Sequence, residues 1–111
     1  MKISGLGIDI VETARIKKAA SKAFLKRVYS QRELAACARS ANKYERLAAR
    51  FAAKEAVIKA LDEKSIPLNQ IEIINELSGR PSVIVKGVKL GLLISISHCR
   101  HYACAVCLAT K

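Results

Sequence analysis

The sequence has 111 residues, of which 51% are hydrophobic and 26% are charged, a composition that excludes disordered and fibrous proteins and predicts a single globular domain over residues 1–111. Lys and Arg number 20 and Asp and Glu number 9, and the net charge of +11 indicates an anionic partner such as a phosphate compound or an acidic protein. The longest apolar run, residues 90–96, is shorter than the roughly 20 residues of a membrane span, and residues 1–5 lack the apolar region of a signal peptide, so we expect a cytoplasmic protein without membrane contact.

The first predicted element is a strand over residues 3–11, in which bulky aliphatic side chains alternate with small or charged residues. Gly5, Gly7 and Asp9 share one face of this strand. Because the two glycines have no side chain, we expect that face to be open, so that a ligand can approach the backbone beside the Asp9 carboxylate. The Gly-x-Gly pattern lacks the third glycine of a dinucleotide-binding fingerprint.

Helices are predicted next along the chain. Residues 13–27 are rich in Ala and Lys and favour one or two short helices. The sequence Ser30-Gln-Arg-Glu33 is a capping box, which predicts a helix that continues to about Arg39. Residues 43–62 have apolar side chains at helical offsets of three and four and form the longest predicted helix.

Glu55 lies in the middle of the apolar stripe of this longest helix. A buried carboxylate without a partner is costly, so Glu55 requires a nearby cation. Lys59, one turn further along, offers an ordinary ion pair. A divalent metal ion shared with Asp9 is the alternative, and the spacing of the residues does not decide between the two.

The C-terminal half predicts β-structure. Two strand-like runs, residues 71–74 and 82–88, flank a turn that contains glycine and proline and suggest a hairpin. Two further runs, residues 92–97 and 102–109, repeat the pattern, so we expect an antiparallel meander. The predicted fold class is α+β, with a small antiparallel sheet packed on one long and several short helices.

The 4 cysteines raise the question of a metal site, because Cys104 and Cys107 have the spacing of a zinc knuckle. These two residues lie in a run that reads as a strand, where residues three apart point to opposite faces. Two such thiols cannot bind one ion. We therefore expect reduced cysteines that pack as small apolar side chains.

Four motifs occur in order along nearly the whole chain: Gly5-Leu-Gly-Ile-Asp-Ile-Val-Glu12 with Arg15, Arg50-Phe-Ala-Ala-Lys-Glu-Ala56 with Lys59, Ser78-Gly-Arg-Pro81, and Ser95-Ile-Ser-His98 with Tyr102. Each motif is weak alone, but an Asp on a Gly-x-Gly-x-Asp strand followed by Lys-Glu-Ala on a long helix is specific. Together they resemble the holo-acyl-carrier-protein synthase family of 4′-phosphopantetheinyl transferases. The turn motif departs from the family's usual Asn-Gly-Lys-Pro, and Cys99, Arg100 and His101 replace a more usual Thr-Lys-Glu turn.

The resemblance implies Mg²⁺-dependent transfer of the phosphopantetheine arm of coenzyme A to a serine hydroxyl of apo acyl carrier protein, with release of adenosine 3′,5′-bisphosphate. Asp9 and Glu55 would hold the Mg²⁺, which typically takes one or two carboxylates and completes its coordination with phosphate oxygens and waters. Glu55 is the candidate general base for the serine, directly or through a metal-bound water. Lys59 would neutralise or protonate the leaving bisphosphate.

By the same resemblance, the residues that would line the coenzyme pocket are Arg50, Gly79, Arg80, Pro81, Ser97 and His98. Four basic residues of the longest helix are candidates for the phosphates of coenzyme A: Lys43, Arg46, Arg50 and Lys54. They lie on several faces of the helix and cannot all reach one ligand bound to one subunit, so some must have another role. In the family, three subunits form a homotrimer with active sites between neighbours, and we expect the same here.

The basic segment over residues 13–32 would dock an acidic helix of the carrier protein. Arg15 and Arg27 are its positions that match the family. We expect this docking surface to be separate from the site of Asp9 and Glu55, so that charge reversal there weakens carrier-protein binding and leaves coenzyme A binding nearly unchanged.

The alternative function is a small basic nucleic-acid-binding module, which the net charge supports. Aromatic residues make up only 5% of the chain, without Trp, and no groove-reading pattern is present, so stacking on bases is disfavoured. A protein that only docks an acidic carrier protein would leave Asp9 and Glu55 unexplained. An enzyme is therefore the preferred interpretation.

Overall fold

The computed structural model describes residues 2–111. The chain begins with a long strand and continues with four helices: β1 (Ile3–Glu12), α1 (Thr13–Ala19), α2 (Lys22–Val28), α3 (Gln31–Ala38) and α4 (Lys43–Leu61). A short 3₁₀ helix then leads into five strands: η1 (Leu68–Gln70), β2 (Ile71–Asn75), β3 (Pro81–Val85), β4 (Val88–Leu90), β5 (Leu93–His98) and β6 (Tyr102–Thr110). The predicted α+β class is confirmed.

The strands form two antiparallel sheets instead of one small sheet built as a meander. One sheet has the order β2-β3-β4 and the other the order β1-β6-β5. The second sheet joins the two ends of the chain, with Asp9 of β1 opposite Ala105 of β6. Local patterns identify the β2–β3 and β5–β6 hairpins correctly, but they carry no information on the pairing of β1 with a strand almost 100 residues away.

The strand predicted over residues 82–88 is also two strands. β3 and β4 meet at a two-residue turn, because Val85 pairs with Val88. Lys86 and Gly87 both have positive φ angles, 49° and 81°. A tight hairpin turn of this type requires left-handed backbone at both central positions, which matches the right-handed twist of the flanking strands.

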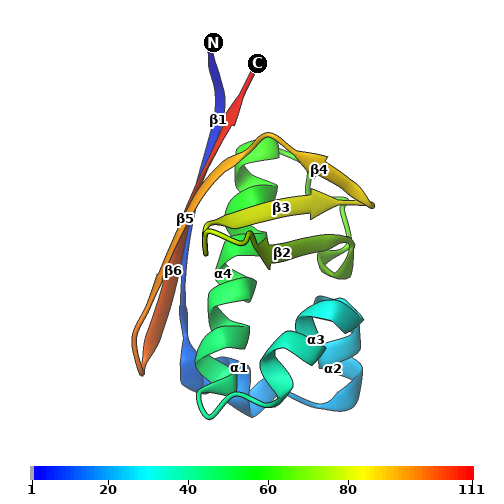
Figure 1. Ribbon diagram of the computed structural model, residues 1–111, viewed down its shortest axis with the longest axis vertical. Coiled ribbons are helices and arrows are strands. Elements are labelled where there is room, and N and C mark those ends of the chain that lie inside the picture. The colour runs from blue at the N-terminus through cyan, green and yellow to red at the C-terminus, as the bar shows by residue number, and fades with distance from the viewer. Residues whose placement is uncertain (1) are drawn as a thin grey trace.

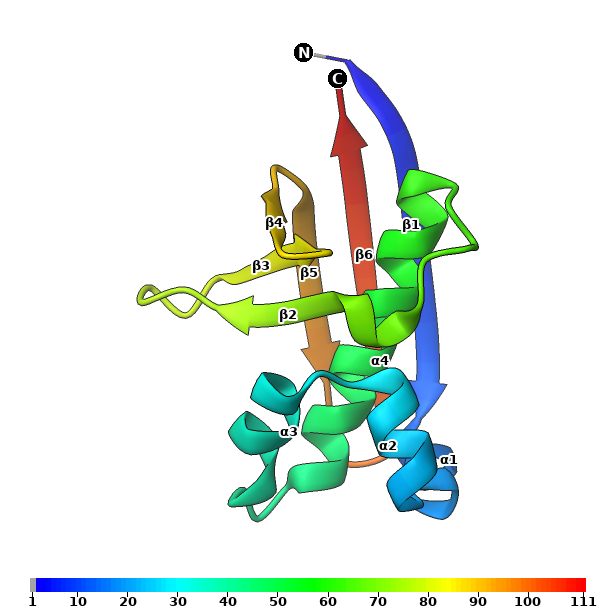
Figure 2. The ribbon, with the colours of Figure 1, turned by 90° about the vertical axis from the view of Figure 1, so that its right-hand side faces the viewer.

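Helix α4 is the centre of the molecule. It lies between the two sheets, with α1, α2 and α3 gathered around its N-terminal end (Figure 1) and the two chain termini beyond its other end (Figure 2). Its small residues are buried on several sides, which allows strands to approach closely: Ala48, Ala49, Ala52, Ala53, Ala56 and Ala60. No described helix is long and apolar enough to cross a membrane.

The face of β1 that carries Gly5 and Gly7 is covered by α4, so the expectation of an open face for a ligand was wrong. A Cβ atom at Gly5 would lie 1.8 Å from the carbonyl oxygen of Ala60, and one at Gly7 would lie 1.9 Å from that of Ala56. Both distances are far below van der Waals contact. The glycines are required because the helix backbone takes the space that side chains would fill.

The opposite face of the sheet β1-β6-β5 carries apolar side chains and is not covered within one chain. Leu6, Ile8 and Ile10 are each 63–68% exposed, and Leu93 of β5 is 45% exposed. Figure 1 shows α4 on one side of this sheet and no described element on the other. A contiguous exposed apolar surface of this kind is typical of a protein interface.

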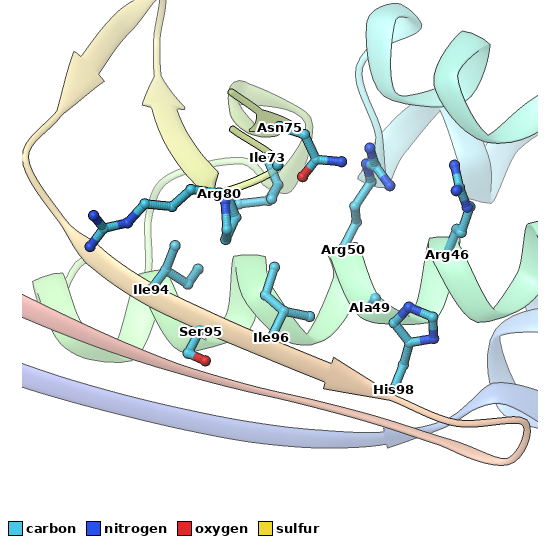
Figure 3. A pocket seen from close by; sticks show the side chains of 12 residues that line it. Arg46, Ala49, Arg50, Ile73, Asn75, Arg80, Ile94, Ser95, Ile96 and His98 are labelled. Atoms are coloured by element: carbon cyan, nitrogen blue, oxygen red, sulfur yellow. The ribbon is translucent and has the colours of Figure 1, made fainter. Parts of the chain in front are cut away.

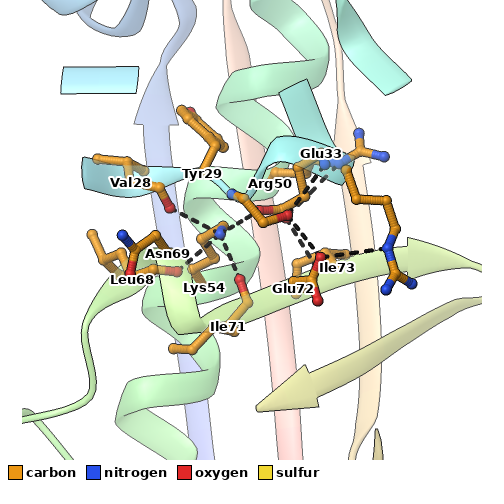
Figure 4. Close-up of polar contacts among 12 residues, drawn as sticks. Val28, Tyr29, Glu33, Arg50, Lys54, Leu68, Asn69, Ile71, Glu72 and Ile73 are labelled. Carbon is orange, nitrogen blue, oxygen red and sulfur yellow. Dashed lines mark hydrogen bonds and ion pairs between the residues drawn. The ribbon is translucent and has the colours of Figure 1, made fainter. Parts of the chain in front are cut away.

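A buried lysine connects α4 to four other elements. The Lys54 ammonium group is fully buried and donates to Glu33 Oε1 of α3 at 2.5 Å. It also donates to the carbonyl oxygens of Val28 (2.9 Å), Leu68 (2.9 Å) and Ile71 (2.5 Å), as Figure 4 shows. Burial lowers the pKa of Lys54, and the Glu33 carboxylate opposes this shift.

Glu33 satisfies several donors at once. Its Oε1 also accepts from the backbone N–H of Ser30, which completes the predicted capping box at the start of α3. Its Oε2 accepts from the backbone N–H of Ile73 at 3.0 Å. The Lys54 and Glu33 pair therefore connects α4 to α2, α3, η1 and β2 through hydrogen bonds. Because its ammonium group is buried in these contacts, Lys54 is not available to bind a phosphate.

The cysteines behave as the strand pattern predicts. All are free, Cys107 is buried, and Cys104 is partly exposed on the other face of β6. Burial raises the pKa of Cys107 to about 11, which keeps the thiol protonated. Residues 2–111 contain no group of three or more His, Cys, Asp or Glu side chains placed to hold a metal ion.

Candidate functional site

Two carboxylates from distant parts of the chain line one small cavity. Asp9 comes from β1 and Glu55 from α4, and the cavity of about 230 Å³ beside them is otherwise mostly apolar. Phe24 and Phe51 contribute to its wall, and Arg15 of α1 adds a cation. Asp9 reaches this position because it follows Gly5 and Gly7 on the face of β1 that packs on α4.

Lys59 pairs with Asp9 and not with Glu55. Its Nζ lies 3.5 Å from Asp9 Oδ1 and donates to the carbonyl oxygen of Ile8 at 2.8 Å. Within the described chain, Glu55 forms no ion pair. Of the two partners that the sequence left open for Glu55, the ordinary ion pair with Lys59 is therefore absent.

The electrostatics at Glu55 favour an additional cation. Burial, followed by the nearby Asp9 charge, raises the pKa of Glu55, and Lys59 only partly opposes this. The Asp9 and Glu55 carboxylates line the same cavity, and among the described residues only the Lys59 ammonium group pairs with either of them, at Asp9. Their oxygen atoms are hard ligands that suit a divalent cation such as Mg²⁺. The other ligands of such an ion would come from phosphate oxygens and waters, since no third acidic side chain of residues 2–111 joins the pair.

A second, larger cavity of about 430 Å³ lies between α4, the β2–β3 turn and β5. Figure 3 shows the side chains along its wall, which include three guanidinium groups and an imidazole: Arg46, Arg50, Arg80 and His98. The wall also contains Gly79 and Pro81 and has no acidic residue. Gly79 has a φ angle of 89°, which favours glycine at this turn. The cavity is suited to an anionic ligand.

All but one of the residues predicted to bind coenzyme A line this basic cavity. Arg50, Gly79, Arg80, Pro81 and His98 line it, whereas Ser97 does not and is exposed on β5. The Arg50 side chain is only 12% exposed, and its Nε lies 4.0 Å from Glu33 Oε2 without a hydrogen bond. The buried Glu33 therefore places a negative charge behind the Arg50 guanidinium.

The carboxylate cavity and the basic cavity lie on opposite sides of α4. At 3.6 residues per turn, Glu55 is rotated by about 140° from Arg50 and about 180° from Arg46 around the helix axis. No residue lines both cavities. One chain therefore presents the two halves of the predicted site in different directions.

Arg15 and Arg27, the predicted docking residues, occupy different environments. Both are exposed, but Arg15 lines the cavity of Asp9 and Glu55. The expectation that both lie apart from the carboxylates was therefore wrong for Arg15, because α1 starts directly at the end of β1. Arg27 lies in the last turn of α2, outside the cavities that contain Asp9 and His98.

Sequence reasoning missed Glu45, which lies 3.2 Å from His98 across 53 positions of the chain. It named Arg46 only as one of four candidates for the phosphates of coenzyme A, and it did not name Asn75, which also lines the basic cavity. The sequence identifies Arg46 as a basic residue of the long helix, but it does not tell which cavity the Arg46 side chain lines. Glu45 carries no sequence signal beyond its position in the first turn of α4, where an acidic residue favours any helix.

The amino-acid sequence is similar to those of a known protein family over nearly its whole length. The family model of the 4′-phosphopantetheinyl transferase superfamily matches residues 5–107. The holo-[acyl-carrier-protein] synthase of Thermodesulfovibrio yellowstonii is 44% identical, over 97% of this chain and 99% of that protein.

Two solved structures show the same fold. The holo-(acyl-carrier-protein) synthase of Bacillus anthracis in complex with CoA (3′,5′-ADP) superposes with a TM-score of 0.84 at 33% identity, over 97% of this chain and 96% of that one. The Helicobacter pylori holo-[acyl-carrier-protein] synthase in complex with coenzyme A has a TM-score of 0.80 at 32% identity, over 94% of this chain and 99% of that one.

Proposed function

Because the chain belongs to the 4′-phosphopantetheinyl transferase superfamily, we propose that it transfers the 4′-phosphopantetheine group of coenzyme A to a serine of apo acyl carrier protein and releases adenosine 3′,5′-bisphosphate. The observation that carries this proposal is that Asp9 and Glu55 line one cavity, in which the partly buried Glu55 carboxylate forms no ion pair with residues 2–111. The relatives named as synthases of holo acyl carrier protein support it, and they do not favour the nucleic-acid-binding alternative.

Asp9 and Glu55 are the residues that would hold Mg²⁺, which when bound neutralises charge on the pyrophosphate of coenzyme A. The Glu55 carboxylate accepts the proton of the incoming serine hydroxyl, and its raised pKa brings it closer to the range in which a general base works at neutral pH. Lys59 Nζ, held beside Asp9, supplies a positive charge and a proton for the leaving bisphosphate.

The basic cavity is the proposed binding site for the phosphates of coenzyme A. Arg50 and Arg80 provide guanidinium groups, and His98 provides a ring nitrogen at the end of β5. Gly79 and Pro81 shape the turn so that the backbone comes close to the ligand. Ser97 lies outside this cavity in one chain, so a role in coenzyme binding requires the surface of a neighbouring subunit.

The direct test of the function is a transfer assay. Purified protein is mixed with coenzyme A, Mg²⁺ and an apo acyl carrier protein, and the carrier protein is weighed by mass spectrometry. A phosphopantetheine adduct on the carrier serine is expected with Mg²⁺ and not with EDTA. An unchanged carrier mass with several apo carrier proteins would contradict the proposed transfer.

We also propose a homotrimer with active sites between subunits. The carboxylate cavity and the basic cavity of one chain face opposite sides of α4, so a ligand that touches both would have to lie between two chains. The apolar face of β1-β6-β5, with Leu6, Ile8 and Ile10, is the proposed contact surface. Charged residues are scarce on this face, as in the centre of stable interfaces.

Light scattering is expected to give three times the mass of one chain. Ile8→Glu places a charge in the proposed contact and is expected to give a folded monomer with little transfer activity, since Ile8 is 65% exposed within one chain and contributes little to its core. Lys64→Glu, at an exposed position after α4, is the control and is expected to remain a trimer. A wild-type monomer or dimer with full activity would contradict the proposal.

Arg27 offers the cleaner test of carrier-protein docking. Exposed ion pairs contribute only about 0–1 kcal/mol each, so the docking free energy should come from the summed positive field and fall as salt rises. Arg27→Glu is expected to raise KM for the carrier protein severalfold and to leave KM for coenzyme A nearly unchanged. Arg15→Glu is expected to affect both, since Arg15 lines the carboxylate cavity. If Arg27→Glu changes neither the carrier-protein KM nor its salt dependence, Arg27 has no docking role.

A further inference from the structure

His98 in the basic cavity is joined to a carboxylate that does not line this cavity. Glu45, in the first turn of α4, places Oε1 at 3.2 Å from Nδ1 of His98 at the end of β5. The two side chains are 24% and 36% exposed, so the contact lies at the rim of the cavity. Figure 3 shows the His98 ring beside Ala49, near the side chains of Arg46 and Arg50.

The contact determines which ring nitrogen carries a proton. A carboxylate can only accept a hydrogen bond, so Nδ1 of His98 must be the donor. In a neutral imidazole only one nitrogen bears hydrogen, and Nε2 is then an acceptor without a proton. A phosphate dianion also only accepts hydrogen bonds. The neutral ring held by Glu45 is therefore unable to donate to a phosphate.

In residues 2–111, the other charged groups around the ring offer His98 no second carboxylate. Arg46 and Arg50 of α4 and Arg80 of the β2–β3 turn carry guanidinium groups, which only donate hydrogen bonds. Glu76, the acidic residue of that turn, pairs with Lys89. Arg100 and His101 follow His98 in the β5–β6 loop and do not line the cavity. Glu45 is thus the carboxylate that contacts His98, and His98 is the imidazole that lines the cavity wall.

We propose that Glu45 is a positioning residue that keeps a proton on Nδ1 of His98, so that the ring takes up a second proton at Nε2 from solvent when the cavity binds a phosphate group. This inference rests on the proposed function for the identity of the ligand, coenzyme A. The doubly protonated ring donates to Glu45 and to the phosphate at once. Binding is therefore coupled to the uptake of one proton and weakens as pH rises.

Glu45→Gln provides the decisive comparison. The Gln side chain can accept from Nδ1 through its oxygen or donate to it through its NH₂ group. Both neutral forms of the ring are then open, and the form with hydrogen on Nε2 donates to the phosphate without proton uptake. The variant is expected to fold, since Glu45 is partly exposed at a helix start. Glu63→Gln, which neutralises an exposed carboxylate after α4, is the matched control.

The first measurement needs no ligand. Proton–nitrogen NMR of the ring nitrogens in ¹⁵N-histidine-labelled protein distinguishes the two neutral forms, and the chain has only 2 histidines, so His101→Gln assigns the spectrum. The neutral His98 ring is expected to carry hydrogen on Nδ1 in the wild type and in Glu63→Gln. In Glu45→Gln the form with hydrogen on Nε2 is expected to appear beside it. Hydrogen on Nε2 in the wild type would overturn the inference.

The second measurement is calorimetric binding of coenzyme A to the full chain between pH 7 and 9, in two buffers of different ionisation heat. The phosphate monoester is already a dianion in this range, so it adds no proton exchange of its own. Wild type and Glu63→Gln are expected to take up protons on binding and to bind coenzyme A more weakly as pH rises. Glu45→Gln is expected to take up fewer protons and to show a weaker dependence on pH.

The two measurements separate this inference from the proposed function. Equal proton uptake by the wild type and Glu45→Gln, with normal binding of coenzyme A, would overturn the role of Glu45 alone. If His98 has the expected Nδ1 proton and coenzyme A binds at no pH, both the proposed function and the coupling to this ligand are overturned.

Discussion

Glu55→Gln and Asp9→Asn are each expected to lower phosphopantetheine transfer by at least about a hundredfold, since each removes a charged ligand from a hard cation and Glu55→Gln also removes the proposed base. Both substitutions keep the size of the side chain, so packing should remain intact. Transfer rates at saturating coenzyme A, carrier protein and Mg²⁺ test the expectation. Glu63→Gln, an exposed neutralisation beyond α4, is expected to retain normal rates.

The thermal stability of Glu55→Gln distinguishes a metal ligand from a merely structural carboxylate. Burial and Asp9 raise the pKa of Glu55 in the folded chain, so the folded state binds a proton more tightly than the unfolded state. As pH rises from the pKa of Glu55 in the unfolded chain through its higher pKa in the folded chain, Glu55 becomes ionised and the metal-free protein loses stability.

At neutral pH without metal, Glu55→Gln is thus expected to melt at a temperature equal to or above that of the wild type. Addition of Mg²⁺ is expected to raise Tm of the wild type and to have little effect on the variant. A variant with full transfer activity at saturating metal would contradict the two-carboxylate assignment. So would an identical response of both proteins to Mg²⁺.

Lys54→Met is expected to lower the free energy of unfolding by about 3–5 kcal/mol, because it removes the ammonium partner of the buried Glu33 carboxylate and the donor to three carbonyl oxygens. For a chain of this size, that corresponds to a fall in Tm of more than about 10 °C. Urea unfolding and thermal melting measure the effect. Lys64→Met, at an exposed position, is expected to change stability by less than about 0.5 kcal/mol.

Two further measurements decide whether Lys54 is structural or binds substrate. Below its lower Tm, the folded Lys54→Met protein is expected to keep the wild-type KM for coenzyme A, because the ammonium group is fully buried away from both cavities. The double variant with Glu33→Gln is expected to be more stable than the sum of the two single effects predicts, because no unpaired buried charge remains. A large increase in KM with unchanged Tm would instead indicate contact with the ligand.

Several local features could be predicted from the sequence because they depend on neighbouring residues. The capping box from Ser30 to Glu33 starts α3, and the 3.6-residue period of α4 is visible over its whole length. The alternation in β6 correctly separates Cys104 from Cys107. Asp9 and Glu55 stood out as charges within apolar patterns, and the structure brings them to one cavity.

Other features depend on which surfaces meet, and sequence patterns do not carry that information. Lys54 and Glu55 are adjacent on one helix, yet their side chains diverge by about 100° around the axis. One is fully buried against Glu33, and the other lines the carboxylate cavity. Glycine is likewise required at positions 5 and 7 by another element, because the α4 backbone occupies the space that a side chain would fill.

The sequence by itself determined the helices, the β2–β3 and β5–β6 hairpins and the family motifs, because these depend on short-range spacing along the chain. Only the tertiary structure decided that β1 pairs with β6, that the strands divide into two sheets, and that Glu45 reaches His98. It also decided that the carboxylate and basic cavities lie on opposite sides of α4. These relations arise from the packing of distant surfaces, where burial and steric fit select one arrangement among many that the same local elements permit.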